Sequence, residues 1–256
     1  MAGDQSLGAM LPELVAIAEA AGAVTLNYFQ SDLEVTAKSD DSPVTAADRD
    51  AESLILERLA RLTPDIPIIS EEAAASGPMP DPPRGRFWLV DPLDGTREFI
   101  AGRDEFTVNI ALISARAPVL GVVHVPARDL TYAGCEGEVT ETDHGATRQI
   151  RARTGPDDGL VVVASRSHRT AQEADFLKDI DVREVIGAGS SLKFCLVAAG
   201  AADLYPRFGP TMEWDTAAGH AVLAAAGGTV STVDGAPLRY GKPGFRNPAF
   251  IARGRE

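Results

Sequence analysis

The stretch Asp91-Pro92-Leu93-Asp94-Gly95-Thr96 is the strongest local signal in the 256-residue sequence. It directly follows Phe87–Val90, an apolar run that predicts a buried strand. Pro92 fixes its own φ and has no N–H, so we expect the pairing of that strand to stop there. Gly95 permits a backbone conformation that is closed to other residues. The stretch therefore predicts a tight turn at the end of a strand.

Such a turn would present the carboxylates of Asp91 and Asp94 and the carbonyl oxygen of Leu93 on one side. Three hard oxygens suit Mg²⁺, which prefers octahedral oxygen ligands and keeps several waters for a substrate. A helix expected to begin near Gly95 and Thr96 would add free N–H groups that could bind a phosphate. The alternative is an ordinary turn with solvated aspartates, because Asp, Pro and Gly are common turn residues.

Further carboxylates lie at the ends of other predicted elements. Glu71-Glu72 follows a short β-rich run, Asp215 begins a predicted helix, and Asp48 lies near the start of another. Taken singly, these are a surface pair, a helix N-cap and a solvated first-turn acid. Brought together, they would repel one another unless protons or cations relieved the charge. A divalent metal is the economical explanation at neutral pH.

Length and composition allow one large domain or two small ones, since 45% of the residues are hydrophobic and 24% are charged. The patterns predict strands at 66–70, 87–90, 107–113, 119–125, 160–164, 182–186 and 203–208, and helices at 7–29, 45–62, 170–178, 191–199 and 216–226. Strands and helices mix in both halves, with a boundary near residue 156. This favours layered sheets and helices in two sub-domains, 1–156 and 157–256, over one doubly wound sheet.

The formal net charge of −13 argues against nucleic-acid polymers and anionic membrane surfaces as partners. The apolar segment 7–29 contains Glu13 and Glu19, and no Lys or Arg precedes it. We therefore expect neither a signal peptide nor a membrane span. Cys135 and Cys195 are too few for a disulfide framework, so we expect both to be unpaired and the protein to be cytoplasmic.

Together, Glu71-Glu72, the stretch 91–96 and Trp214-Asp215 resemble, in order and spacing, the signatures of the inositol monophosphatase superfamily of Mg²⁺-dependent, lithium-sensitive phosphatases. The resemblance implies an α+β fold, a layered αβαβα sandwich with the active site between two sub-domains. Finer features are similar to its 3'(2'),5'-bisphosphate nucleotidase branch, the enzymes of sulfur assimilation. They are the segments 38–45, 95–100, 165–168, 189–194 and 203–207, with Arg97-Glu98-Phe99 where inositol phosphatases usually have Thr-Asn-Phe.

The resemblance also implies a division of labour among the site residues. The ligands of two or three Mg²⁺ ions would be Glu71, Asp91, Asp94, Asp215 and the Leu93 carbonyl. Asp48 and Thr96 would orient and deprotonate the attacking water, with help from Glu71, and no covalent phosphoenzyme would form.

Substrate contacts are implied in the same way. Lys193 and Arg207 would bind the phosphate that is not cleaved, and His168 and Ser190 would contact the adenosine. Gly95, Thr96 and Asp215 would lie against the substrate as well. The alternatives are that Lys193 is a solvated helix residue, His168 a loop histidine and Ser190 a helix N-cap.

The reaction expected on this basis is hydrolysis of the 3'-phosphate of 3'-phosphoadenosine 5'-phosphate, a small phosphorylated nucleotide, to AMP and phosphate. Two alternatives stay open: an inositol or sugar phosphatase, and a non-catalytic metal-binding regulatory protein on the same scaffold. The sequence leaves undecided whether the chain is a monomer or a homodimer, and whether 3'-phosphoadenosine 5'-phosphosulfate is a substrate.

Overall fold

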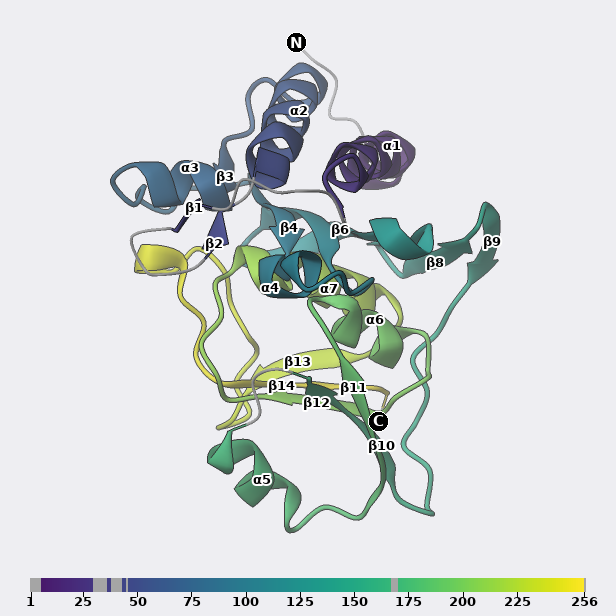
Figure 1. Ribbon diagram of the computed structural model, residues 1–256. Coiled ribbons are helices and arrows are strands. Elements are labelled where there is room, and N and C mark those ends of the chain that lie inside the picture. The colour runs from purple at the N-terminus through teal and green to yellow at the C-terminus, as the bar shows by residue number, and fades with distance from the viewer. Residues whose placement is uncertain (1–5, 30–35, 38–42, 45, 167–169, 256) are drawn as a thin grey trace.

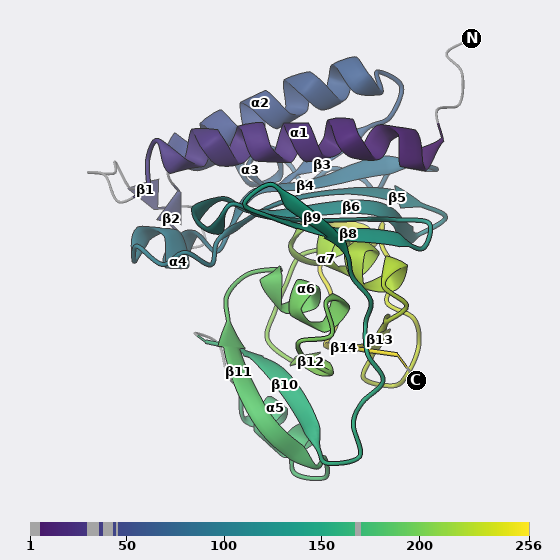
Figure 2. The ribbon, with the colours of Figure 1, turned by 90° about the vertical axis from the view of Figure 1, so that its right-hand side faces the viewer.

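The structure is a computed structural model that describes residues 6–29, 36–37, 43–44, 46–166 and 170–255. Its elements stack in five layers, helix, sheet, helix, sheet, helix (Figure 1 and Figure 2). The outer helices are α1 (Leu7–Leu26) and α2 (Ala46–Leu62), the central ones α6 (Leu192–Ala198) and α7 (Trp214–Ala225), and the far one α5 (Ala171–Leu177). The predicted αβαβα sandwich is confirmed.

The first sheet has seven strands in the order β3-β4-β5-β6-β7-β8-β9. All neighbours are antiparallel except β3 and β4, which are parallel. The strands are β3 (Ile68–Ser70), β4 (Phe87–Asp94), β5 (Thr107–Ser114), β6 (Ala117–Val125), β7 (Leu130–Cys135), β8 (Glu138–Asp143) and β9 (Ala146–Gln149). The polar strand β9 is exposed along its whole length, which explains why hydrophobic patterning did not predict it.

Both faces of this sheet are covered, so its inner strands are apolar at successive positions. Trp88 and Val90 belong to the hydrophobic core under α1 and α2. Phe87 and Leu89 belong to the core between the two sheets. This alternation follows from the two-residue repeat of a strand.

The second sheet has five strands in the order β11-β10-β12-β14-β13. They are β10 (Leu160–Ser165), β11 (Val182–Ala188), β12 (Leu204–Arg207), β13 (Thr229–Thr232) and β14 (Phe250–Arg253). Strands β10, β11 and β12 are parallel, so their carboxyl ends lie at the same edge of the sheet. A small antiparallel pair, β1 (Thr36–Ala37) and β2 (Pro43–Val44), lies outside both large sheets.

Helix α7 packs very closely against the first sheet. A Cβ atom on Gly121 of β6 would lie 2.6 Å from the carbonyl oxygen of Ala218, and one on Gly134 of β7 would lie 2.8 Å from the Cα of Val222. Neither distance is tolerated between real atoms, so glycine is required at both positions. The two glycines thereby fix the distance between the sheet and the helix that carries Asp215.

The chain leaves the first sheet after Gln149 and enters the second at Leu160, close to the predicted boundary. One hydrophobic core cluster nevertheless takes members from both sides, Val123 and Trp214 among them. The division into sub-domains 1–156 and 157–256 stays a prediction.

Helix α1 is long and apolar enough to satisfy the length and composition criteria of a membrane span. Its buried side chains, Met10, Leu14 and Ile17, belong to the core formed with α2 and the first sheet. The absence of a span and a cytoplasmic location stay predictions. Cys135 and Cys195 are both unpaired, as predicted, and both are buried.

Candidate active site

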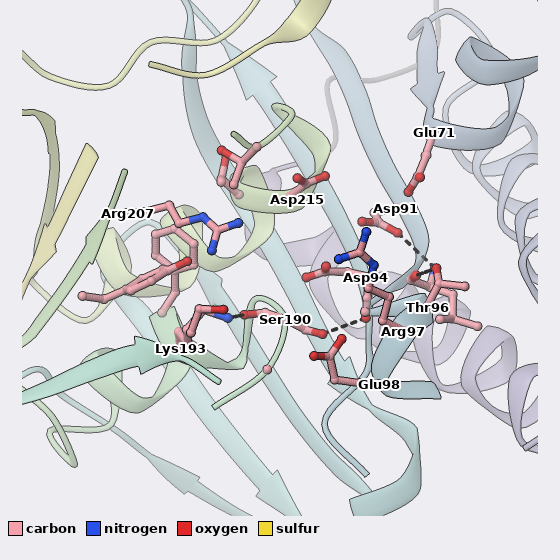
Figure 3. Close-up of a pocket in the computed structure, with 18 residues that line it drawn as sticks. Glu71, Asp91, Asp94, Thr96, Arg97, Glu98, Ser190, Lys193, Arg207 and Asp215 are labelled. Carbon is pink, nitrogen blue, oxygen red and sulfur yellow. Dashed lines mark hydrogen bonds between the residues drawn. The ribbon is translucent and has the colours of Figure 1, made fainter. Parts of the chain in front are cut away.

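A pocket of about 290 Å³ lies where β4 meets helices α6 and α7 (Figure 3). Ten of the predicted site residues line it: Glu71, Asp91, Leu93, Asp94, Gly95, Thr96, Ser190, Lys193, Arg207 and Asp215. Asp48 is buried in the first turn of α2 and is not among the lining residues. His168 lies outside the described residues. The structure thus brings together residues from both halves of the chain.

The turn at 91–96 differs from the prediction in one respect. Strand β4 does not end before Pro92 but continues to Asp94, where it pairs again with Thr107 of β5. The register shifts between Asp91, which faces Asn109, and Asp94. The prediction that pairing stops at Pro92 is wrong, because the proline lies in a bulge, where its missing N–H costs no ladder bond.

Hydrogen bonds inside this bulge hold its oxygen atoms in place. The Leu93 N–H donates to Asp91 Oδ1 at 3.1 Å, and the Thr96 hydroxyl donates to the Leu93 carbonyl at 3.3 Å. Helix α4 (Thr96–Ile100) begins directly after Gly95, whose φ of 92° is in the left-handed region that glycine alone adopts readily. The expected helix start and glycine conformation are both confirmed.

Asp94 is held by a segment from the other half of the chain. Its Oδ2 atom accepts a hydrogen bond of 2.7 Å from the backbone N–H of Ser191, and its carbonyl accepts one of 2.8 Å from the Ser190 hydroxyl. A Cβ atom on Gly95 would collide with that hydroxyl. Ser191, not Ser190, precedes the first residue of α6, so the N-cap alternative for Ser190 is wrong.

Asp215 lies in the first turn of α7, which begins two residues earlier than predicted. The residue before that helix is Glu213, so the N-cap alternative for Asp215 is wrong. Asp215 Oδ2 instead accepts the Met212 N–H at 2.8 Å.

Glu213 is a residue that the sequence did not single out. Its fully buried carboxylate accepts the N–H groups of Gly241 and Lys242 at 2.6 and 2.9 Å, and it lies 2.7 Å from Lys242 Nζ. These bonds tie the start of α7 to the chain that follows β13. They therefore help to position Asp215.

The carboxylates of the pocket are close enough to perturb one another. Burial, followed by the charges of Glu71, Asp94, Asp215 and Asp48, raises the pKa of Asp91 well above its ordinary value. Burial, followed by the charges of Asp94 and Glu71, raises the pKa of Asp215 well above its ordinary value. Burial raises the pKa of Asp94 to about 6, although the charge of Lys193 opposes the shift. A cation in the pocket would stabilise the ionised forms.

In the described part of the chain, no group of three or more His, Cys, Asp or Glu side chains is arranged so that it could bind one metal ion. The donor chemistry nevertheless fits Mg²⁺, because carboxylate and carbonyl oxygens are its preferred protein ligands. Burial is the largest cause of the raised pKa of Asp91 and Asp215, and neighbouring carboxylate charges add to it; a divalent ion would relieve that repulsion.

Two cations face the carboxylates across the pocket. Figure 3 shows Lys193 and Arg207 on the side opposite Glu71 and Asp91. Lys193 is buried, which lowers its pKa to about 8, and its Nζ donates to the Ser190 carbonyl at 2.6 Å. The alternative that Lys193 is a solvated helix residue is therefore wrong.

The guanidinium group of Arg207 has a hydrogen-bond donor without a partner among the described residues. Its Nη2 donates to the Pro210 carbonyl at 3.3 Å, but its buried Nε has no hydrogen-bond partner among the residues that the structure describes. A buried donor without a partner costs free energy, and an anion bound in the pocket would remove that cost.

Sequence comparison assigns the chain to a family. The profile of the Inositol monophosphatase family matches residues 8–253, and the chain belongs to this family. Among curated proteins, the 3'(2'),5'-bisphosphate nucleotidase CysQ of Escherichia coli O6:H1 (strain CFT073) is 46% identical over 251 residues, covering 94% of this chain and 98% of the relative. CysQ of Escherichia coli K12 is 45% identical with the same coverage.

Two solved structures allow the branches of the family to be compared. CysQ from Bacteroides thetaiotaomicron is 37% identical and has a TM-score of 0.78, with 94% of this chain and 96% of that chain covered. The inositol monophosphatase from Anabaena also has a TM-score of 0.78, with 98% and 92% covered, but is only 27% identical. The fold is therefore equally close to both, whereas the sequence is closer to CysQ.

Proposed function

We propose that the chain is a Mg²⁺-dependent 3'(2'),5'-bisphosphate nucleotidase that hydrolyses 3'-phosphoadenosine 5'-phosphate to AMP and phosphate. The observation that carries the proposal is a pocket with carboxylates on one wall and two cations, the buried Lys193 and the partly buried Arg207, on the other. A substrate with two phosphates can use both walls at once. The sequence identity of 46% to a nucleotidase of this class supports the same choice.

In this proposal, the magnesium ligands are Glu71, Asp91, Asp94, Asp215 and the Leu93 carbonyl, for two or three ions. When bound, Mg²⁺ neutralises charge on the phosphate and lowers the pKa of a bound water. The protein contributes the arrangement: the bulge at Leu93 presents the carbonyl, and the Met212 N–H orients Asp215.

Thr96 and Asp48 prepare the attacking water. The Thr96 hydroxyl lines the pocket and orients the water toward phosphorus. Asp48, buried in the first turn of α2 and close enough for its charge to act on Asp91, receives the proton with assistance from Glu71. The new P–O bond forms from water, the bond from phosphorus to the 3'-oxygen breaks, and that oxygen takes up a proton. No protein nucleophile is required.

Recognition falls to the opposite wall. Arg207 binds the phosphate that is not cleaved, using the Nε–H that has no partner within the described part of the chain, and the ammonium group of Lys193 adds positive charge. Ser190 and Gly95 line the space between the two walls, and His168 stays a predicted adenosine contact.

An inositol or sugar phosphatase is the second candidate, favoured by the equal structural similarity to the Anabaena enzyme. Phosphate release from 3'-phosphoadenosine 5'-phosphate and from inositol 1-phosphate, each with Mg²⁺ and with excess EDTA, decides between the two. We expect kcat/KM to favour the nucleotide by about tenfold or more, equivalent to about 1.4 kcal/mol. Equal values for both substrates would remove the case for a nucleotidase.

A further inference from the structure

Glu105, in the loop between α4 and β5, has a carboxylate that is saturated with donors and only 7% exposed. Its Oε1 accepts from Arg166 Nη2 at 2.8 Å and from Arg128 Nη2 at 3.2 Å. Its Oε2 accepts from Arg166 Nε at 3.1 Å and from the backbone N–H of Gly189 at 3.0 Å. Four such bonds use the accepting capacity of a carboxylate fully.

These donors connect three separate parts of the fold. Arg128 belongs to the short 3₁₀ helix η1 (Pro126–Arg128) after β6, Arg166 directly follows β10, and Gly189 directly follows β11. Arg166 Nη2 also donates to the Gly187 carbonyl in β11 at 2.6 Å. Glu105 therefore ties the first sheet to the carboxyl ends of two parallel strands in the second, through charge-assisted bonds of which the one from Gly189 is buried and those from the arginines are partly buried.

The segment that Glu105 holds, Gly189-Ser190-Ser191, borders the pocket. Its two serines bind Asp94, and the Ser190 carbonyl accepts from Lys193 Nζ. Ser190 has a φ of 49°, in the left-handed region that serine seldom adopts, so the segment must be held in shape by its surroundings. A Cβ atom on Gly189 would lie 3.0 Å from the Glu105 Cβ, which indicates how closely the two backbones approach.

We infer that Glu105 is a positioning residue for substrate specificity. It does not line the pocket but fixes segment 189–191, and with it the Ser190 carbonyl that accepts from the Lys193 ammonium group on the wall proposed to bind the phosphate that is not cleaved. The inference rests on the proposed nucleotidase function, which assigns the second phosphate to the wall that Lys193 and Arg207 form.

The variant Glu105→Gln tests this role. Glutamine keeps the size of the side chain but turns one acceptor into an NH₂ donor, which would oppose the N–H groups of Arg166 or Gly189. The matched control is Asp104→Asn, which removes the same charge from the neighbouring residue. Asp104 is 57% exposed and accepts hydrogen bonds from the same Arg128 but none from Arg166 or Gly189, although its charge also acts on Arg166.

Two readouts are needed. The first is kcat/KM for 3'-phosphoadenosine 5'-phosphate divided by kcat/KM for glycerol 2-phosphate, which lacks the base and the second phosphate. We expect Glu105→Gln to lower this ratio about tenfold, mainly through the KM of the nucleotide, as for loss of one buried charge-assisted bond. The second is amide hydrogen exchange, which should become faster at 189–191 in Glu105→Gln and stay unchanged in Asp104→Asn.

An equal loss of activity on both substrates, or an unchanged exchange rate at 189–191, would refute the positioning role. If Glu105→Gln does not fold, Glu105→Asp keeps the charge on a shorter side chain and is measured in the same way. The nucleotide preference of the wild-type protein tests the proposed function separately. Without that preference the function fails, while the exchange experiment still reports on the contact between Glu105 and Gly189.

Discussion

The backbone N–H of Ser191 donates a 2.7 Å hydrogen bond to Asp94 Oδ2, although 97 residues separate the two along the chain. Asp94 belongs to the bulge of β4 and Ser191 to the segment before α6. This bond therefore joins the wall of proposed metal ligands to the wall proposed to bind the second phosphate. The position of the proposed metal ligands and the position of the substrate-binding residues therefore depend on the same hydrogen bond. Disturbing either residue should affect both functions.

Replacing Asp94 by Asn should lower kcat about 100-fold or more, because it removes a charge that acts on the reacting phosphate. The Ser191 N–H can still donate to the amide oxygen of Asn, so the fold should persist. Phosphate release from 3'-phosphoadenosine 5'-phosphate measures the effect, and Asp81→Asn, at an exposed position, is the control. A variant that kept the wild-type rate would mean that the activity comes from a contaminant, and a regulatory role would then gain support.

Removal of Mg²⁺ should abolish phosphate release and lower the melting temperature. The carboxylates of Asp91 and Asp215 would then repel one another without a cation to relieve them. Adding Mg²⁺ back should restore both properties in a concentration-dependent way. A calorimetric titration of the EDTA-treated protein checks this, and a melting temperature that does not respond to Mg²⁺ would count against a metal site.

Lithium should inhibit the enzyme by competing for one magnesium position, as the family resemblance implies. Rates measured in millimolar LiCl, with NaCl at equal ionic strength as the control, provide the test. Identical rates in the two salts would show that this family property does not extend to the chain.

Replacing Arg207 by Ala should raise the KM for 3'-phosphoadenosine 5'-phosphate about tenfold to a hundredfold, since one or two charge-assisted bonds to phosphate are lost. The KM for glycerol 2-phosphate should change little, because that substrate has no second phosphate. Arg239→Ala, at an exposed arginine, serves as the control. A parallel rise for both substrates would assign Arg207 to the cleaved phosphate instead.

The buried imidazole of His124 should make stability depend on pH. Burial lowers its pKa from 6.5 to about 4, and its Nδ1 lies 2.9 Å from the Thr131 hydroxyl, within hydrogen-bonding distance. Between these pH values the unfolded chain binds a proton that the folded protein excludes. Stability is therefore lost as the pH falls from 6.5 to 4, by about 1.4 kcal/mol per pH unit at most.

The variant His124→Asn should remove that slope, and His144→Asn, at a histidine that is 75% exposed, should leave it in place. Urea unfolding of each variant at several pH values provides the comparison. Because the active-site carboxylates titrate in all three proteins, only the difference between slopes is interpreted. Equal slopes for wild type and His124→Asn would contradict the prediction.

Most residues of the pocket could be predicted from the sequence because they lie next to a predicted strand end, turn or helix start. Asp91 and Asp94 follow the apolar run 87–90, Glu71 follows a strand, and Asp215 lies in the first turn of a helix, so their types and positions could be interpreted without a fold. The bulge at Pro92 could not be predicted, because proline usually ends strand pairing and only the partner strand β5 determines that pairing resumes at Asp94.

Residues that act through distant partners were also missed. Glu213 binds chain 28 and 29 residues further on, and Glu105 binds Arg166, 61 residues further on. Nothing next to either glutamate in the sequence marks it, since an isolated acid usually lies at the surface. Strands β13 and β14, of four residues each, were also missed.

The close packing of α7 on Gly121 and Gly134 has a consequence for the active-site pocket. We expect an alanine at either position to push α7 away from the first sheet and to move Asp215, which lies in the first turn of that helix. The size of the pocket proposed to bind the phosphate therefore depends on two glycines of the first sheet that pack against α7 and do not line the pocket themselves.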